Sequence, residues 1–206
     1  RQDIIWHKPN PMPESVRDRC TKAHEYIFLL SKKNKYYYDN EIIKEPSKYA
    51  GDDRGSRPDS RRDKNMNSMN GITPPMKNKR SVWTVTTKPY KGAHFATFPM
   101  DLIEPCVLAG CPEKVCVDCN EPHKRITVDF EKQCKCETNE TKAGTVLDPF
   151  GGAGTTGVVA ENNKRNAVLL ELNPEYIEIA EERIAKNREA IAQAEYEENL
   201  QAKFDF

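Results

Sequence analysis

Apolar residues along the chain form short runs that predict several strands and a few helices. Apolar runs at 3–6 and 24–30, and an alternating run at 81–85, are typical of strands. Large apolar residues also recur from His94 to Leu108, and Pro99 near the start of this run predicts a helix beginning there.

The last third of the chain has the clearest pattern. Two apolar runs are typical of buried strands, and a run of glycines separates the first of them from a helical segment. Asn173 is a good N-cap and Pro174 suits a first helical position, so a second helix is expected there. Such an alternation forms a parallel α/β unit. The predicted order is strand 145–148, glycine turn 151–154, helix 155–162, strand 167–172 and helix 174 to about 198.

Charge divides the chain into two parts. Residues 1–100 carry 20 Lys+Arg against 11 Asp+Glu, whereas residues 101–206 carry 12 against 21, so a net charge of zero conceals a basic half. Residues 51–64 hold no apolar side chain larger than proline and cannot offset the entropy cost of ordering. A plain linker and a basic loop that orders on nucleic acid both fit this segment. No apolar run reaches the ~18 residues of a membrane span.

Two carboxylates accompany the predicted glycine turn. Glu171 lies at the end of the second strand, where an acidic side chain can accept the hydroxyl protons of a ribose. A nucleoside-containing cofactor is therefore expected. Residues 152–157 also match the dinucleotide pattern G-x-G-x-x-G, but Asp148 before the turn would repel a pyrophosphate and could pair with a cationic amino group.

The motifs around the turn carry a family resemblance. The string DPFGGAGTT at 148–156, followed by LELNPEY at 170–176, resembles the S-adenosylmethionine site of amino-group DNA methyltransferases, which modify adenine N6 or cytosine N4. HFATFP at 94–99 resembles the family's other cofactor motif, which in the permuted (beta) subgroup precedes the glycine loop, as it does here. WHKPNPMP at 6–13 and HEYI at 24–27 resemble motifs of that subgroup's target-base half.

The resemblance implies a Rossmann-like α/β methyltransferase sheet that binds S-adenosylmethionine. Asp148 and the turn of Phe150, Gly151, Gly152 and Gly154 would hold the methionine moiety, and Glu171 would bind the ribose. For the aromatic residues among the predicted contacts, plain core packing is the alternative. Three further groups complete the predicted set: Thr155 and Thr156 close the turn, Asn173 and Pro174 flank the adenine, and Phe95, Thr97 and Phe98 cover the cofactor from the other side.

The family's catalytic element does not occur in the sequence. It consists of Asp, Asn or Ser, then Pro-Pro, then Tyr, Phe or Trp, and it holds the amine of the flipped base. Residues 73–76 read Thr-Pro-Pro-Met and lack the aromatic, so no catalytic residue is assigned. In the permuted subgroup the element would precede Asp3. We therefore expect an N-terminally truncated chain that is inactive alone, with catalysis supplied by a missing segment or within a homodimer.

Cysteines form a second group of candidate residues. Seven cysteines without a secretion signal favour reduced thiols or a bound metal over disulfides. Residues 111–142 are polar and Cys-rich, and a tetrahedral Zn²⁺ would supply the stability that this insert's own core cannot. Cys20 and Cys106 are expected in the core, and free surface thiols are the alternative to zinc. The predicted ligands are Cys116, Cys119, Cys134 and Cys136, with His123 or Cys111 as a substitute for one of them.

These patterns predict three parts: residues 1–38 belong to the target-base half, 39–90 form a partly disordered DNA-recognition insert, and 91–206 form the cofactor half. The hypothesis is a portion of a site-specific methyltransferase acting on double-stranded DNA. The resemblance implies a bacterial or phage-encoded cytoplasmic enzyme of the kind used in restriction–modification. The alternatives are a catalytically inactive DNA-binding module that retains this fold and, less favoured because of Asp148, a dinucleotide-dependent oxidoreductase.

Overall fold

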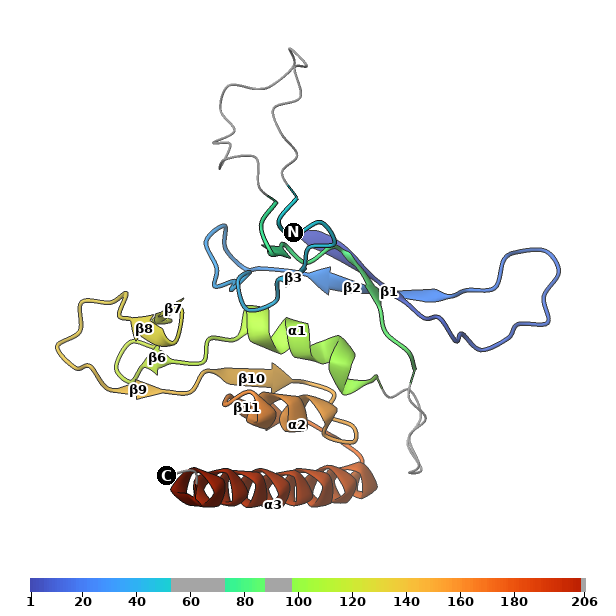
Figure 1. Cartoon of the computed structure of the whole chain (residues 1–206). Helices are drawn as coiled ribbons and strands as arrows, with labels where there is room; N and C mark the ends of the chain where they lie inside the picture. The colour runs from blue at the N-terminus through green and yellow to red at the C-terminus, as the bar shows by residue number, and fades with distance from the viewer. Residues whose placement is uncertain (53–72, 88–97, 205–206) are drawn as a thin grey trace, which may run out of the picture. The chain divides into compact units, whose positions relative to one another are not determined.

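A computed structural model of the chain describes residues 1–52, 73–87 and 98–204 (Figure 1). The chain divides into two compact units, one formed by Arg1–Asp39 with Ser81–Phe206 and the other by Asn40–Arg80. Among the described residues, no helix has the length and apolar character needed to cross a membrane.

A three-stranded sheet lies in the first unit. Its central strand β1 (Gln2–His7) pairs antiparallel with β2 (His24–Leu29) and parallel with β5 (Val82–Thr84), which confirms the three strands predicted for this region. Ile4, Trp6 and Trp83 share one face of the sheet and form a buried cluster with Leu102 of helix α1 (Met100–Gly110). The Trp6 indole N–H also donates to the Val85 carbonyl at 2.8 Å, which satisfies its one polar group.

A second, two-stranded parallel sheet carries the glycine turn. Strands β10 (Thr145–Asp148) and β11 (Asn166–Leu169) pair in register, and α2 (Thr155–Asn162) connects them (Figure 1). The predicted first strand and helix are confirmed. The second strand was expected over 167–172 but ends at Leu169, because the Leu170 carbonyl turns to accept the Gly151 N–H at 2.8 Å. Leu172 is accordingly 99% exposed.

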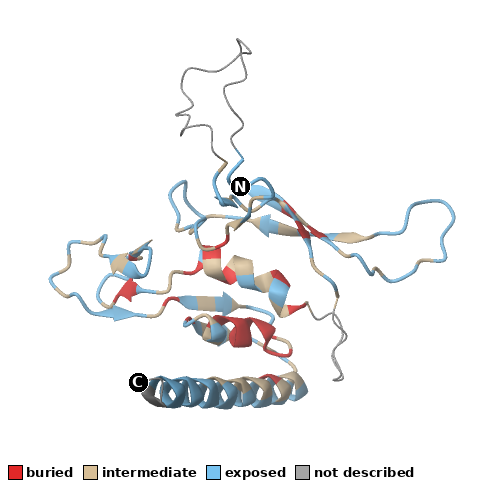
Figure 2. Cartoon of the chain, viewed as in Figure 1, coloured by how far each residue is buried: buried red, intermediate tan, exposed pale blue. Residues whose placement is uncertain are grey.

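Helix α3 (Pro174–Phe204) follows β11 and is longer than predicted. The Asn173 side-chain oxygen accepts the Glu175 N–H at 3.0 Å, which confirms the predicted N-cap. Ala180 is buried near the beginning of the helix, and α3 packs there against α2. Most of the later residues are exposed (Figure 2), as expected for a helix end rich in glutamate.

The Cys-rich insert between α1 and β10 consists of two short antiparallel strand pairs. β6 (Val115–Cys116) pairs with β9 (Thr141–Lys142), and β7 (Lys124–Ile126) pairs with β8 (Asp129–Glu131). Among residues 112–143, only Val115, Cys116 and His123 are buried side chains. The insert therefore has almost no apolar core, as its sequence predicts.

In the second unit, the described residues form one strand pair, β3 (Glu45–Pro46) with β4 (Met76–Lys77), and include the buried side chain of Ile43. The predicted recognition insert extends to residue 90, but this unit ends at Arg80. The difference arises because β5, which follows Arg80, pairs with β1 in the sheet of the first unit. The basic segment at 53–72 lies outside the described residues.

Candidate cofactor and metal sites

The turn between β10 and α2 requires glycine at two positions. Gly152 has a φ of 49° and Gly154, the N-cap of α2, has a φ of 72°, a left-handed conformation that glycine adopts without steric cost. A Cβ on Gly154 would also lie 3.0 Å from the Ala180 Cβ of α3. Two features therefore favour glycine at position 154: the left-handed backbone conformation and the close approach of α3.

Asp148, the last residue of β10, points its carboxylate at the start of α2. Its Oδ1 accepts the Phe150 N–H at 3.0 Å, and its Oδ2 accepts the Thr156 hydroxyl at 2.6 Å. The first turn of a helix is the place where an anion is most favoured, because the unpaired N–H groups carry partial positive charge. In this chain the Asp148 carboxylate already supplies that negative charge.

Glu171 holds a second carboxylate beside the turn. Its Oε2 accepts the Gly152 N–H at 2.8 Å, and its Oε1 accepts the N–H groups of Leu172 and Asn173 at 2.9 and 3.0 Å. Three backbone N–H groups that donate to one carboxylate fix its orientation beside the turn. Glu171 thereby joins the glycine turn to the residues that follow β11.

Arg183 of α3 is a residue of this site that sequence reasoning missed. Its Nη1 donates to the Ala153 carbonyl at 3.1 Å and to the Thr155 hydroxyl at 2.9 Å. Arg183 lies three residues after the buried Ala180 and therefore on the same face of α3. This spacing is the feature of the sequence that could have indicated that Arg183 faces the turn. The glycine turn is thus held from α3 as well as from β10 and β11.

Other predicted contact residues have differing surroundings. Phe98 packs against the buried core cluster and also lines, together with Asp148 and Thr156, a cleft of about 490 Å³ between α1 and β10. Phe150 is 84% exposed, and Pro174 is exposed at the start of α3. Phe95 and Thr97 lie outside the described residues.

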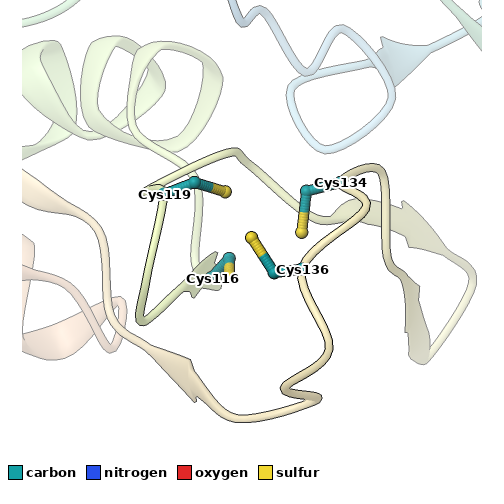
Figure 3. Close-up of side chains that lie close together, drawn as sticks. All are labelled: Cys116, Cys119, Cys134 and Cys136. Carbon is teal, nitrogen blue, oxygen red and sulfur yellow. The ribbon is translucent and has the colours of Figure 1, made fainter.

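Four of the seven cysteines meet in the insert. The sulfur atoms of Cys116, Cys119, Cys134 and Cys136 all lie within 4.8 Å of one another, and Figure 3 shows the four side chains gathered together. A tetrahedral Zn²⁺ with Zn–S bonds of about 2.3 Å would place its sulfurs about 3.8 Å apart, so the spacing fits after a small contraction. The structure thus brings the four predicted ligands together.

The backbone around Cys116 favours its thiolate form. The backbone N–H of Cys119 approaches the Cys116 sulfur and, with that of Asp118, lowers the pKa of Cys116 to about 7. Asn120 has a φ of 58° and its N–H donates to the Cys116 carbonyl at 3.0 Å, which closes a tight turn around the sulfur. Four thiols packed this closely offer the ligand set of a tetrahedral metal site.

The remaining cysteines and His123 lie elsewhere. His123 is buried and Cys111 caps the end of α1, and neither belongs to the four-thiol group within the described part of the chain. Cys106 packs against the core cluster as predicted. The prediction that Cys20 lies in the core is wrong, since Cys20 is exposed.

Comparisons with known proteins agree with these motifs. The N6/N4 family model described as DNA methylase matches residues 1–182. The Type II methyltransferase M.SmaI of Serratia marcescens is 44% identical over 188 residues, which cover 91% of this chain and 47% of that protein. M.Cfr9I of Citrobacter freundii is 40% identical over 185 residues, covering 89% and 44%. The chain therefore spans about half the length of these relatives.

Solved structures show the same fold at low sequence identity. A crystal structure of the M1.HpyAVI–SAM complex matches with a TM-score of 0.50 and 20% identity, covering 89% of this chain and 60% of that one. The PvuII DNA methyltransferase, described as cytosine-N4-specific, matches with a TM-score of 0.50 and 18% identity, covering 90% and 55%. The fold is therefore the α/β methyltransferase fold.

Proposed function

Because this chain belongs to the N6/N4 DNA methylase family, we propose that it forms the S-adenosylmethionine-binding half of a site-specific DNA amino-methyltransferase of the permuted subgroup. The observation that carries the proposal is the Asp148 carboxylate at the start of α2. A pyrophosphate in this place would be repelled, whereas the ammonium of a methionine group would be attracted. The site therefore favours S-adenosylmethionine over a dinucleotide.

Three of the predicted residues within the described part of the chain have surroundings that suit a role in cofactor binding. When bound, S-adenosylmethionine supplies a methyl group already activated by its sulfonium. Asp148 binds the ammonium, and the Glu171 carboxylate, held at the turn by backbone N–H groups, accepts a ribose hydroxyl. Phe98 provides an apolar wall in the cleft that Asp148 also lines. These residues bind and orient the cofactor, and orientation is the main requirement for a donor that is already reactive.

We propose double-stranded DNA as the substrate, methylated at adenine N6 or cytosine N4. In the unit Asn40–Arg80, a cleft of about 600 Å³ is lined by Lys48, Lys77 and Arg80 together with Tyr49. Cationic side chains suit phosphate contacts, and an exposed tyrosine can stack on a base. Lys77 and Arg80 also pair with Glu45, at 3.3 and 2.6 Å, so their positions in the cleft are partly fixed.

The group that polarises the target amine would have to come from outside these 206 residues, since they contain no tetrapeptide of the family's catalytic type. A further segment would supply it, because a second copy of the same 206 residues lacks the tetrapeptide as well. The proposed setting is a restriction–modification system in the cytoplasm of a bacterium, or one encoded by a phage. The alternative is a catalytically inactive DNA-binding module that keeps the glycine turn for structure alone.

We also propose that Cys116, Cys119, Cys134 and Cys136 hold a structural Zn²⁺. Four thiolates leave no open position for a substrate, which is the arrangement of structural rather than catalytic zinc. The metal would replace the apolar core that the insert lacks. Intact-protein mass spectrometry under native conditions tests this directly, with one zinc per chain as the expected result.

Equilibrium binding of radiolabelled S-adenosylmethionine to Asp148→Asn tests the proposed cofactor site. An asparagine keeps an oxygen for the Phe150 N–H but loses the charge, so we expect binding to weaken by about tenfold or more, as hydrogen bonds to charged groups are worth about 1.5–3 kcal/mol. Asp129→Asn, the same change at an exposed position of β8, is the matched control. Equal affinity in the two variants would contradict the role assigned to Asp148, and no binding by the folded parent chain would favour the inactive module.

A further inference from the structure

The first and last residues of the Cys-rich insert lie in contact with each other, next to α1 and β10. We call residues 111–116 and 141–144 the neck of the insert. Within the neck, Val115 pairs with Lys142 and Cys116 pairs with Thr141. A Cβ on Gly144 would lie only 2.2 Å from the Pro112 carbonyl oxygen, so the two backbones touch there.

The neck also joins the end of α1 to the beginning of β10. Cys111 caps α1, and Gly144 immediately precedes the first residue of β10. The chain at the start of β11 fastens both sides, because Arg165 Nε donates to the Cys111 carbonyl at 3.2 Å and the Asn166 N–H donates to the Gly144 carbonyl at 2.8 Å. The neck is therefore the end at which α1 and β10 are fastened together.

The cofactor cleft lies along this pair, and its key residues are at the opposite end from the neck. Phe98 precedes α1 and Asp148 ends β10, while both line the cleft. An 11-residue helix is about 16 Å long, so a rotation of only about 4° at the neck moves the start of α1 by about 1 Å. A displacement of about 1 Å is enough to weaken a positioned contact severely.

The four-thiol group is joined to the neck directly, because Cys116 belongs to both. Cys116 is a residue of β6 with no exposed surface, and the other three cysteines come from the loops beyond. Glu113 in the neck also pairs with Arg125 of β7 and, at 3.7 Å, with Arg165, whose side chain is only 2% exposed. A metal bound by the four thiols would fix the insert in the position in which Glu113 pairs with both Arg125 and Arg165.

We propose that metal occupancy of the four-thiol site sets the affinity of the cofactor cleft, by holding α1 against β10 through the neck. The inference rests on the proposed function, since it takes S-adenosylmethionine as the ligand and a thiolate-bound divalent metal as the structural ion. Linkage makes the effect reciprocal, so that S-adenosylmethionine must tighten metal binding by the same factor.

The first test measures S-adenosylmethionine affinity by calorimetry on the zinc-loaded chain and on the same chain stripped by a chelator, with circular dichroism recorded on both. We expect the dissociation constant to rise by about tenfold or more on stripping, and S-adenosylmethionine to slow zinc loss to a competing chelator. Dissociation constants that agree within about twofold in two folded samples would overturn the inference. A loaded, folded chain that binds no S-adenosylmethionine would instead contradict the proposed function.

Variants separate the neck from general folding. Cys119→Ser combined with Cys134→Ser should reproduce the stripped state, while Cys20→Ser, at the exposed cysteine outside the group, should leave affinity unchanged. Gly144→Ala keeps all four thiols but forces the neck apart. If the stripped chain unfolds, the Gly144→Ala variant provides the test. A variant that retains zinc and binds S-adenosylmethionine about tenfold more weakly supports the inference. A variant that retains zinc and binds S-adenosylmethionine as tightly as the parent overturns it.

Discussion

Replacement of Gly154 by alanine tests how the glycine turn is built. Gly154 has a φ of 72° at the N-cap of α2, and an added Cβ would lie 3.0 Å from the Ala180 Cβ and 3.2 Å from the Ala180 Cα. Both features oppose a side chain at this position. The variant should therefore lose stability and also weaken cofactor binding, because α3 and the turn would have to separate.

The expected magnitude has two parts. A left-handed φ costs an alanine roughly 1–2 kcal/mol. Forcing an extra carbon into a packed contact costs roughly 1–3 kcal/mol, and the neighbour here is helix backbone that cannot rotate away. The free energy of unfolding should accordingly fall by about 2–5 kcal/mol, which is a large fraction of the stability of an ordinary domain.

Urea unfolding of the zinc-loaded chain measures this loss. Gly110→Ala is the matched control, since a Cβ on Gly110 would meet nothing within 4 Å at the end of α1, and we expect its stability to be unchanged or slightly raised. Ala180→Gly in the Gly154→Ala background removes the contact with the Ala180 Cβ but leaves the Ala180 Cα in place, so it should recover only part of the steric cost. A Gly154→Ala variant as stable as the parent, or the absence of any coupling to position 180, would refute this reasoning.

Three further predictions concern residues that hold the site and the core. Arg183→Ala should weaken S-adenosylmethionine binding by about tenfold through loss of two hydrogen bonds to the turn, whereas Arg188→Ala, which removes an exposed ion pair, should not; equal effects in calorimetry would exclude a role for Arg183. Arg165→Ala should lower the free energy of unfolding by about 1.5–3 kcal/mol, since it removes the hydrogen bond from a buried guanidinium to the Cys111 carbonyl while Glu113 keeps Arg125, and a loss under about 1 kcal/mol in urea would contradict this. Trp83→Ala should cost about 3–5 kcal/mol by the same assay, and a smaller loss would mean that the cluster around β1 does not form the core.

The parts of the fold that were predicted from the sequence depend on short-range chemistry. The first buried strand, the glycine turn and α2 follow each other within 18 residues, and their identity is set by apolar runs and by glycines with positive φ. The N-cap at Asn173 depends on a hydrogen bond between residues two apart. Such features leave a local signature that a single sequence displays.

The features that were missed depend on contacts between distant residues. The second strand ends at Leu169 because a carbonyl at 170 bonds to the turn at 151, and no local pattern encodes that partner. Arg183 reaches the Ala153 carbonyl across 30 residues. The four cysteines were predictable from their spacing in an insert without an apolar core. The close approach of Gly144 to Pro112 in the neck was not predictable, because the two residues lie 32 positions apart in the sequence.

Calorimetric titration of the zinc-loaded chain with S-adenosylmethionine, with NAD titrated in parallel, tests the proposed cofactor most directly. The Asp148 carboxylate at the start of α2 predicts saturable binding of S-adenosylmethionine at about one molecule per chain and no measurable binding of the pyrophosphate-containing NAD. Binding of NAD instead, or of neither molecule by a chain shown to be folded, would contradict the assignment of this half as a methyl-donor site.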